Sequence, residues 1–302
     1  MEEVTVVVPA TTANLGPGFD CLGAALSLYN QFTFRLSDRW QVQATGPGAE
    51  RIAVDSHNLV HRGFRRLYEY LDRPAPPVAL AIELGVPLAR GLGSSATALV
   101  GGLLGANHLA GQPLSLEELQ TIAIALEGHP DNVVPALLGG CCLTTTRSDQ
   151  SHMTCPIPWS TQVVPVVAIP EFELSTAKAR AVLPATYSRS DVIFNVAHLG
   201  MLLQGLGTGQ GELLETALDD RIHQPYRSSL IPGYGAVQAA AIASGAYGVV
   251  ISGAGPSLLA LTTPSQSEAV AQAMAGAWHK EGIPATAKVL PIDTQGARLG
   301  SH

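Results

Sequence analysis

Hydrophobic and polar residues repeat with two different periods along the chain, which predicts a mixture of strands and helices. Short apolar runs predict strands at residues 4–8 and 78–84. Residues 31–35 and 41–44 alternate in the same way and are candidates to pair after the first strand. Residues 58–70 instead have the spacing of an amphipathic helix, with one apolar side.

Two further helices are marked by composition and by their start and stop signals. Residues 94–109 form a helical run rich in Ala and Gly. Each interior glycine costs about 1 kcal/mol relative to alanine, so we expect this helix to pack closely against another backbone. Ser115 and Glu118 have the spacing of a capping box that opens the next helix, and Gly128 stops it.

The second half of the chain alternates strand and helical patterns, which indicates an α+β arrangement of one sheet and one helical layer. A passage rich in Pro, Ser and Thr at residues 154–162 is the best candidate for a boundary between two domains. The elements expected around it lie at residues 141–146, 163–169, 176–183, 191–206, 211–220, 232–244, 249–252, 258–262, 266–280 and 287–292.

Composition describes a well-buried globular protein and limits its partners. Hydrophobic residues make up 46% of the sequence and charged residues 14%. No apolar run approaches the roughly 20 residues of a membrane span, so we expect no membrane partner. The four cysteines lack metal-binding spacing, and with no basic leader we expect a cytoplasmic location. A net charge of −7 argues against nucleic acid, so an anionic ligand needs locally placed arginines.

The segment from Pro87 to Thr97, with the sequence PLARGLGSSAT, is the most informative stretch of the chain. Gly91 and Gly93 permit backbone N–H groups to approach an anion closely. The helix that follows offers unsatisfied N–H groups at the positive end of its dipole. The hydroxyl of Ser94 can add a bond to a phosphate or to a metal ion on it. This segment therefore predicts a phosphate-binding loop.

Three other interpretations compete for the same loop. A P-loop requires Lys before its Ser or Thr, and Gly93 is followed directly by Ser94. The spacing Gly91-x-Gly93-x-x-Ala96 satisfies a relaxed dinucleotide fingerprint, but no strand leads directly into it and no acidic residue ends a second strand at the expected distance. A plain glycine turn that caps a helix stays open for the loop taken alone.

A second glycine-rich loop follows the first predicted strand and carries Asn14 and Asp20. A turn separates these residues, so both side chains can face one pocket. Asp20 would there hold an ammonium group or take a proton. Asn and Asp also cap local backbone in ordinary surface turns, and that interpretation stays open for the loop by itself.

Several polar functions gather where the capped helix ends, at Glu127, His129, Asp131 and Asn132. A Glu at a helix C-terminus faces the negative end of the dipole at a cost of about 0.3–1 kcal/mol, which a bound Mg²⁺ would offset. Mg²⁺ commonly takes one or two protein oxygens plus substrate phosphate, so Ser94 and Glu127 are the candidate ligands. A solvated Glu, a satisfied His and a helix-capping Asp are the alternatives.

The second half of the chain supplies candidate groups for a substrate carboxylate. Thr176 and Arg180 lie four residues apart on one face of a predicted helix, and Arg227 lies in a separate polar segment. A guanidinium grips a carboxylate through two parallel hydrogen bonds, although a surface role is the default for a single Arg. Ser252 and Gly253 open a glycine turn that permits a ligand or a backbone to approach closely.

Three of these segments together resemble the signature motifs of the GHMP small-molecule kinases. Residues 9–20, 87–97 and 251–257 have the order and separations of that family's motifs, and GLGSSA is specific to it. Within the family, the runs NLGPGFD, EGHPDNV, STAKAR and RSSLIP are similar to the homoserine kinase branch. The similarity covers nearly the whole chain.

The resemblance implies an α+β, two-domain fold with the active site between the domains. An N-terminal nucleotide-binding α/β domain with the phosphate loop is expected at residues 1–158, and a ferredoxin-like C-terminal domain at residues 159–302. The implied reaction is ATP-dependent phosphorylation of the hydroxyl of L-homoserine to O-phospho-L-homoserine, in threonine biosynthesis. ATP and Mg²⁺ are the implied cofactors, and a homodimer is an expectation at the family level.

The same resemblance implies a role for each matched position. Ser94 and Glu127 would hold Mg²⁺, and Asn132 would lie near the accepting hydroxyl. Asp131 is either a general base or a structural residue. The residues implied around the amino acid are Asn14, Asp20, His129, Thr176, Arg180, Arg227, Ser252 and Gly253. Those implied around the nucleotide phosphates are Pro87, Leu88, Ala89, Arg90, Gly91, Leu92, Gly93, Ser94, Ser95, Ala96 and Thr97.

Three other functions stay open beside this one. The chain can be another GHMP kinase that acts on mevalonate, a sugar or shikimate, or a non-catalytic nucleotide-binding protein on the same scaffold. The presence of Glu127, Arg180 and Arg227 argues against a protein without catalysis. The relaxed dinucleotide fingerprint also leaves the function of a nicotinamide-dependent oxidoreductase open, which we do not expect.

Overall fold

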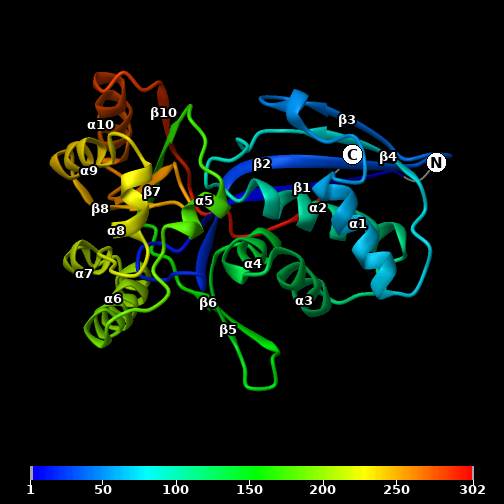
Figure 1. Ribbon diagram of the computed structural model, residues 1–302, viewed down its shortest axis with the longest axis horizontal. Coiled ribbons are helices and arrows are strands. Elements are labelled where there is room, and N and C mark those ends of the chain that lie inside the picture. The colour runs from blue at the N-terminus through cyan, green and yellow to red at the C-terminus, as the bar shows by residue number, and fades with distance from the viewer. Residues whose placement is uncertain (1–2, 301–302) are drawn as a thin grey trace.

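Two β-sheets organise the chain, and helices cover each of them (Figure 1). The computed structural model describes residues 3–300. The first sheet has the strand order β11-β1-β2-β4-β3, and the hairpin of β5 and β6 joins it through β2. The second sheet has the order β10-β7-β9-β8. The chain therefore has the mixed α+β architecture that its sequence predicts.

The first sheet is built on a long antiparallel pair, in which β1 runs beside β2 with a shift of register after Pro9. Such an irregularity bends a strand at the point where it leaves the regular sheet. Its described strands are β1 (Glu3–Ala13), β2 (Leu22–Leu36), β3 (Gln41–Thr45), β4 (Val78–Glu83), β5 (Cys141–Thr146), β6 (His152–Ile157) and β11 (Arg298–Leu299).

Four α-helices cover one face of this sheet, and their ends follow the expected signals. The Ser115 capping box is formed, and Gly128 ends that helix in the left-handed conformation. A Cβ on Gly102 would lie 2.2 Å from the carbonyl oxygen of Val60, so the expected close approach of two helix backbones is confirmed. The helices are α1 (Leu59–Tyr70), α2 (Ser94–Leu109), α3 (Leu116–Glu127) and α4 (Pro130–Leu138).

The second sheet is ferredoxin-like. Its four strands follow the chain in the order β7, β8, β9, β10, yet lie side by side in the order 4-1-3-2, with α9 and α10 packed on them. The elements of this half are β7 (Val164–Pro170), α5 (Thr176–Ala181), α6 (Arg189–Thr208), α7 (Gly211–Ala217), α8 (Gln224–Arg227), α9 (Tyr234–Ala243), β8 (Ala246–Ile251), β9 (Leu258–Thr262), α10 (Ser267–Lys280) and β10 (Ala285–Val289). Two 3₁₀ turns, η1 (Ala49–Arg51) and η2 (Ser228–Leu230), complete the described elements.

Two local predictions were wrong, that for residues 41–44 and that for the helix from residue 232. The strand at residues 41–45 pairs in parallel with β4, so it extends the sheet from the other side of β2. Residues 154–157 of the expected boundary passage lie in β6, because His152–Ile157 pairs with β5, and the boundary itself stays a prediction. The helix expected from residue 232 starts at Tyr234, because Gly233 before it adopts a left-handed conformation.

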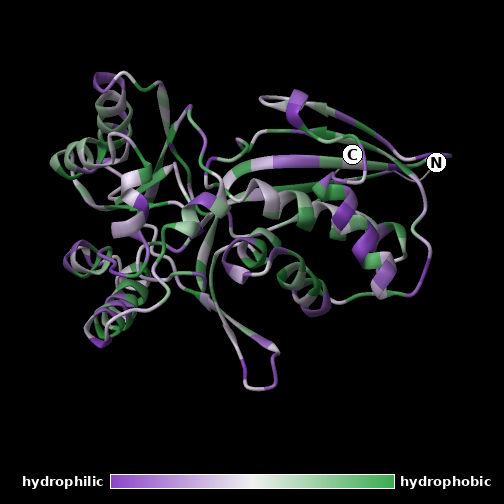
Figure 2. Ribbon diagram, viewed as in Figure 1, coloured by the Kyte–Doolittle hydropathy of each residue, from purple (hydrophilic) through white to green (hydrophobic). Residues whose placement is uncertain are grey.

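The apolar residues form cores on the faces of the two sheets. Phe32 and Phe34 of β2 are buried with Phe64 of α1, and Val166 of β7 is buried with Trp278 of α10. In Figure 2, hydrophobic stretches occur on strands and on the inner sides of helices, whereas hydrophilic residues gather on the outer sides of helices such as α1. None of the helices in the described part of the chain has the length and apolar character needed to cross a membrane.

The end of the described chain returns to the first sheet. The segment after β10 contacts β2. Leu26 forms an isolated β-bridge with Ile292, and the hydroxyl of Tyr29 donates to Asp293 Oδ2 at 2.8 Å. β11 then pairs with β1 through Val6 and Val7. The division of the chain into domains between residues 158 and 159 stays a prediction. The segment after β10 belongs to the second half of the chain but pairs with strands of the first sheet.

Candidate functional site

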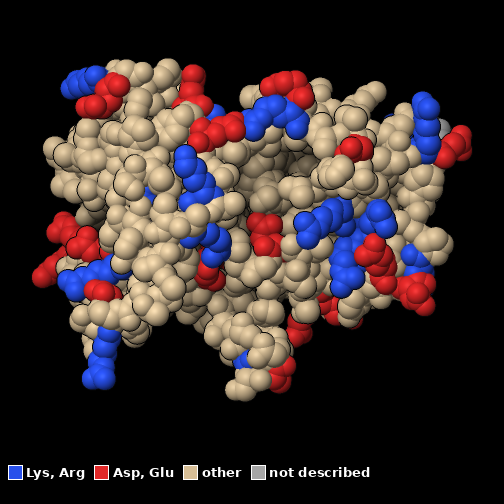
Figure 3. Space-filling view, in the orientation of Figure 1, with Lys and Arg blue, Asp and Glu red and all other residues tan. Residues whose placement is uncertain are grey.

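A cavity of about 420 Å³ lies where the three glycine-rich segments of the sequence meet. Its walls include Asn14 and Asp20 of the loop after β1, residues 88–95 of the loop before α2, and Gly253 of the loop after β8. Figure 3 shows a hollow near the centre of this face, with acidic and basic side chains around it. The fold thus brings together motifs that lie more than 230 residues apart in the sequence.

The predicted phosphate loop has a backbone that requires glycine. Gly91 and Gly93 have φ values of 71° and 66°, and Ala89 between Leu88 and Arg90 is also left-handed at 54°. A Cβ on Gly91 would lie 2.3 Å from the carbonyl oxygen of Ser252. A Cβ on Gly93 would lie 1.9 Å from Thr11 Oγ1. Gly93 is the N-cap of α2, so the free N–H groups of that helix begin at the cavity.

Contacts with the other two motifs hold this loop in place. The hydroxyl of Ser252 donates to the carbonyl oxygen of Gly91 at 2.7 Å and to Thr12 Oγ1 at 3.0 Å. The N–H of Thr11 donates to the carbonyl oxygen of Leu92 at 3.1 Å. Ser252 therefore holds the loop, and it is not among the residues found on the cavity wall. The same is true of Pro87, Ala96 and Thr97 within the described residues.

Asn14 ties two loops together on the cavity wall. Its side-chain amide donates to the carbonyl oxygen of Gly253 at 2.9 Å, and its Oδ1 accepts the N–H of Asp20 at 2.9 Å. The residue is buried and left-handed, with φ of 72°. These contacts fix the loop that places Asp20 on the cavity wall.

Asp20 and Arg180 form a bidentate ion pair. The guanidinium donates to both carboxylate oxygens, at 2.9 and 2.7 Å. Both side chains are about one third exposed, and Asp20 raises the pKa of Arg180 by accepting its hydrogen bonds. The sequence predicted an acid for an ammonium group and a base for a carboxylate, but not that the two would contact each other.

Arg227 has a different environment, because its partners are neutral. Only 2% of the residue is exposed. It donates to the carbonyl oxygens of Ala179 and Gly253, at 3.1 and 3.2 Å. The ring of Phe19 lies 5.1 Å from its guanidinium carbon. No carboxylate of the described residues forms an ion pair with it, and burial lowers its pKa.

His129, Asp131 and Asn132 form a hydrogen-bonded group at the start of α4. His129 Nδ1 lies 2.6 Å from Asp131 Oδ1, and this bond raises the pKa of His129 above its ordinary value. Asp131 is buried, while His129 is the N-cap of α4. The alternative in which Asp131 is the N-cap of the next helix is therefore excluded. Asn132 Oδ1 accepts the hydroxyl of Thr11 at 2.7 Å, and its amide donates one hydrogen to Asp131 Oδ1 at 3.4 Å, which leaves the second amide hydrogen to offer a substrate.

Two sets of residues have donor atoms that suit a cation. Glu127 Oε1 accepts the hydroxyl of Ser95 at 2.9 Å, and Ser94 lies beside them on the cavity wall. The structure thus joins Glu127 to Ser95, the neighbour of the predicted ligand. Ligand atoms of Asp20, His129 and Asp131 also lie within 4.8 Å of one another. In that second set, the ion pair with the guanidinium of Arg180 already neutralises the negative charge of Asp20.

Some residues of the site carry no sequence signal that we used. Residues 51–53 and 57–60 also line the cavity, and they include the apolar side chains of Ile52 and Leu59. Asn30 stabilises the phosphate loop by hydrogen bonds on both sides of it. Its amide donates to Thr97 Oγ1, and its Oδ1 accepts the N–H of Val86. A polar residue inside the apolar alternation of residues 22–36 is the signal that could have revealed Asn30. Thr176, by contrast, lines the cavity as predicted.

Comparisons with known proteins agree with this geometry. Residues 58–140 match the model of the GHMP kinases N terminal domain, and residues 202–280 match that of the GHMP kinases C terminal domain. The homoserine kinase of Trichormus variabilis is 60% identical over 299 residues, which cover 98% of this chain and 99% of that protein. The homoserine kinase of Thermosynechococcus vestitus is 58% identical over 98% of the chain.

Solved structures show the same fold. The crystal structure of homoserine kinase from Cytophaga hutchinsonii has a TM-score of 0.90 and 31% sequence identity, covering 99% of this chain and 98% of that one. A mevalonate kinase structure has a TM-score of 0.71 at 12% identity, which is a likeness of fold alone.

Proposed function

The chain belongs to the GHMP kinases and, within them, to the homoserine kinases, and we propose that its central cavity transfers the γ-phosphoryl group of ATP to the side-chain hydroxyl of L-homoserine. The product is O-phospho-L-homoserine, on the route to threonine. The cavity has one end made of backbone amides and another made of charged side chains, which suits a triphosphate and an amino acid.

The buried guanidinium of Arg227 is the observation that carries this assignment to the cavity. A buried cation without a counter-charge is costly, because its desolvation is not offset by an anion. Its present partners are carbonyl oxygens, an imidazole and a ring. A substrate carboxylate would supply the missing charge through two parallel hydrogen bonds.

Asp20 completes the recognition of an amino acid. Its carboxylate has about four lone-pair positions, and the bidentate contact with Arg180 uses two of them. We assign the substrate ammonium group to the remaining positions. Homoserine then lies with its two charges between Asp20 and Arg227, and Thr176 is the hydroxyl on the same wall.

We assign the nucleotide phosphates to the loop of residues 87–97. Positive φ values at Gly91 and Gly93 turn the backbone so that the free N–H groups of α2 begin at the cavity. We assign the base to the wall formed by residues 51–53 and 57–60. No lysine takes part in this loop, so backbone dipoles supply most of the positive potential.

The donors around Glu127 fit Mg²⁺ better than the second acidic group does. Mg²⁺ prefers oxygen ligands, and Ser94, Ser95 and Glu127 offer only oxygens at the start of the phosphate loop helix. The other group includes an imidazole and a carboxylate that a guanidinium already neutralises. When bound at Ser94 and Glu127, Mg²⁺ would reduce the negative charge on the phosphates.

Catalysis in this arrangement rests on alignment and charge. Phosphoryl transfer requires little covalent work from the protein, so the positions of the hydroxyl and the γ-phosphate dominate the rate. Asn132 can donate its remaining amide hydrogen toward the accepting hydroxyl, since Thr11 occupies its oxygen and Asp131 accepts the other hydrogen. Asp131 is hydrogen-bonded to His129, so we assign it the orientation of that imidazole instead of direct proton transfer.

Two further predictions concern the protein as a whole. A cytoplasmic location is supported by the four free cysteines, two of which are buried neighbours in β5. A homodimer stays a prediction from the family.

An assay of ADP release with a set of alternative acceptors tests the proposed function. We expect L-homoserine to exceed L-serine, mevalonate and galactose by at least about 100-fold in kcat/KM, because only homoserine presents both charges with the right reach. Two analogues sharpen the test: 4-hydroxybutanoate lacks the ammonium group, and 3-aminopropan-1-ol lacks the carboxylate. Turnover of mevalonate or galactose without turnover of homoserine would contradict the proposal.

A further inference from the structure

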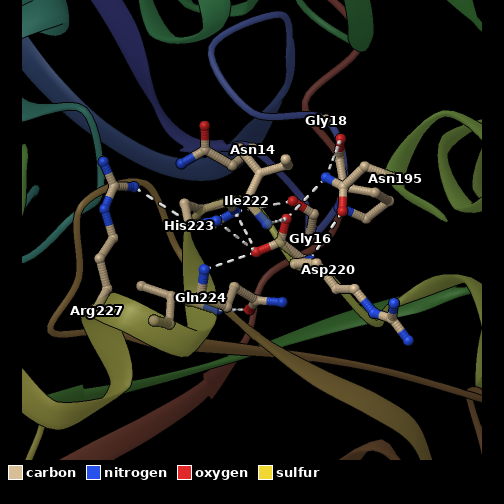
Figure 4. A network of polar contacts seen from close by, with 12 residues as sticks. Asn14, Gly16, Gly18, Asn195, Asp220, Ile222, His223, Gln224 and Arg227 are labelled. Carbon is tan, nitrogen blue, oxygen red and sulfur yellow. Dashed lines mark hydrogen bonds and ion pairs between the residues drawn. The ribbon is translucent and has the colours of Figure 1, made fainter. Parts of the chain in front are cut away.

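His223 lies fully buried between the first motif loop and Arg227 (Figure 4). It precedes α8, and Arg227 ends that helix four residues later. The other side of the imidazole faces Gly16, in the loop that leads from β1 to Asp20. No sequence motif drew attention to this histidine.

The two ring nitrogens of His223 have opposite roles. Nε2 lies 2.8 Å from the carbonyl oxygen of Gly16, and a carbonyl can only accept, so Nε2 carries the hydrogen. Nδ1 then has a free lone pair in the neutral ring, and it lies 3.4 Å from a terminal nitrogen of Arg227, which can only donate. The contacts therefore define one neutral tautomer.

The surroundings keep the ring neutral and fixed in orientation. Burial lowers the pKa of His223. The charged groups that act on it are Asp220 of its own segment, Arg227 of α8 and Asp20 of the first loop. The ring also stacks on Phe19, with centroids 5.1 Å apart, and Phe19 in turn contacts the guanidinium of Arg227.

Asp220 holds the backbone at His223 in place through hydrogen bonds to its N–H groups. Its fully buried carboxylate accepts the N–H groups of His223 and Gln224, at 2.9 and 2.6 Å. It also accepts the side-chain amide of Asn195 from α6 at 2.8 Å, and that amide reaches Pro17 of the first loop at 3.4 Å. Figure 4 shows this network between the segment of His223 and the loop of Gly16.

We propose that His223 is a positioning residue for the amino-acid substrate, because its imidazole couples the loop that carries Asp20 to the guanidinium of Arg227. One bond fixes the loop and the other fixes the guanidinium, so the ring sets the spacing between the groups assigned to the ammonium and the carboxylate. An apolar side chain of the same volume would fill the space but make neither bond. This inference rests on the proposed function of the cavity.

Substitutions that keep one bond at a time separate positioning from packing. The Oδ1 atom of an Asn can take the place of Nδ1, and the terminal amide of a Gln can take the place of Nε2. We expect His223→Ala, which loses both bonds, to raise the KM for homoserine about tenfold. His223→Gln loses the acceptor for Arg227 and His223→Asn loses the donor to Gly16, so we expect each to raise this KM about threefold to fivefold, because each breaks one side of the coupling. The KM for ATP should stay within about twofold in all three variants.

The matched control is His279→Gln, since His279 also bonds a backbone carbonyl, that of Ala285, but lies at the end of α10 away from the cavity. It should leave both KM values unchanged. A parallel rise of both KM values in the Asn and Gln variants, or wild-type KM for homoserine in every variant, would overturn the inference. If the Ala variant fails to fold, the Asn and Gln pair still decides. Wild-type protein that does not phosphorylate homoserine would instead contradict the proposed function.

Discussion

The two ends of the cavity are built in different ways. The phosphate end is one continuous run of residues 88–95, whose shape depends on left-handed glycines and on backbone hydrogen bonds. The amino-acid end is assembled from separate loops, and its ion pair joins Asp20 to Arg180 across 160 positions of sequence. Backbone geometry is encoded locally, whereas a constellation of charges exists only once the chain has folded. The two ends should therefore fail in different ways when mutated.

The largest effect should follow from removal of the Arg227 guanidinium. Truncating one partner of a buried, hydrogen-bonded charge pair costs about 2–5 kcal/mol, so Arg227→Met should lower kcat/KM for homoserine by at least about 100-fold. The KM for ATP should change less than about twofold, because the hydrogen bonds of Arg227 go to Ala179, His223 and Gly253 and not to the phosphate loop. Steady-state kinetics with each substrate varied in turn measures the split.

The control for this variant is Arg221→Met, since Arg221 is about half exposed and contacts Asp191 at the surface. Its kinetics should match the wild type. An equal loss of affinity for ATP and homoserine in Arg227→Met would remove the distinction between the two ends.

The phosphate end should respond to an added methyl group. Gly93→Ala places a Cβ where Thr11 Oγ1 now lies and forces alanine into a left-handed conformation, with strain of about 1–3 kcal/mol. We expect the KM for ATP to rise about 30-fold and the KM for homoserine to rise less than about threefold. Nucleotide binding measured by calorimetry checks the first value independently of turnover.

Gly111→Ala is the matched variant for strain without a clash. Gly111 has φ of 88°, but a Cβ there meets nothing within 4 Å. It should lower the free energy of unfolding by about 1 kcal/mol and leave the KM for ATP unchanged. If both alanine variants weaken ATP binding equally, the contact between a Cβ at position 93 and Thr11 Oγ1 does not explain the loss of ATP affinity.

A smaller effect should appear in the metal dependence of the phosphate end. Glu127→Gln keeps an oxygen for the hydroxyl of Ser95 but removes a negative charge from the assigned Mg²⁺ ligands. The Mg²⁺ concentration for half-maximal activity should rise about tenfold, with a change below about twofold in the KM for homoserine. Glu117→Gln, on the exposed start of the same helix, is the control. An unchanged Mg²⁺ titration in Glu127→Gln would rule out the assigned ligand.

The smallest effect should be the pH dependence of stability at the amino-acid end. Asp131 raises the pKa of His129 in the folded chain, so this bond stabilises the protein fully below the ordinary value of about 6.5. The contribution is lost as pH rises through the raised pKa. Urea denaturation of the wild type and Asp131→Asn should show a larger difference in unfolding free energy at pH 6 than at pH 9.

Asp219→Asn, an exposed acid of the neighbouring segment, should give a difference that is nearly flat over the same pH range. A wild-type advantage over Asp131→Asn that grows with pH would have the wrong sign for a protonated His129 bonded to Asp131.

The sequence was sufficient for most of the fold because the signals were local. The helix of residues 94–109 and the capping box at Ser115 were predicted to within a residue or two, as was the strand of Leu258–Thr262. The predicted strand of residues 4–8 was too short, because β1 continues to Ala13 through residues that also serve the site. The pairing of β3 could not be predicted, since alternation fixes the faces of a strand but not its neighbour.

In the candidate site, too, the features encoded locally could be predicted from the sequence and those that depend on tertiary packing could not. Eighteen of the twenty-two predicted site residues lie on the cavity wall, and their hydrogen bonds distinguish the residues that shape the loops from those that face a substrate. Ser252 holds Gly91, and Asn14 holds Gly253, so both act through the shape of the loops. The contact of Asp20 with Arg180 and the role of His223 depend on tertiary packing, for which no local pattern exists.

The pairing of β11 with β1 has a consequence for the order of assembly. Val6 and Val7 pair with Leu299 and Arg298, which follow them by more than 290 positions. This edge of β1 therefore cannot pair with β11 until the segments of both sheets that lie between them have been synthesised. The pairing joins the two most distant described strands of the chain after both walls of the cavity are present.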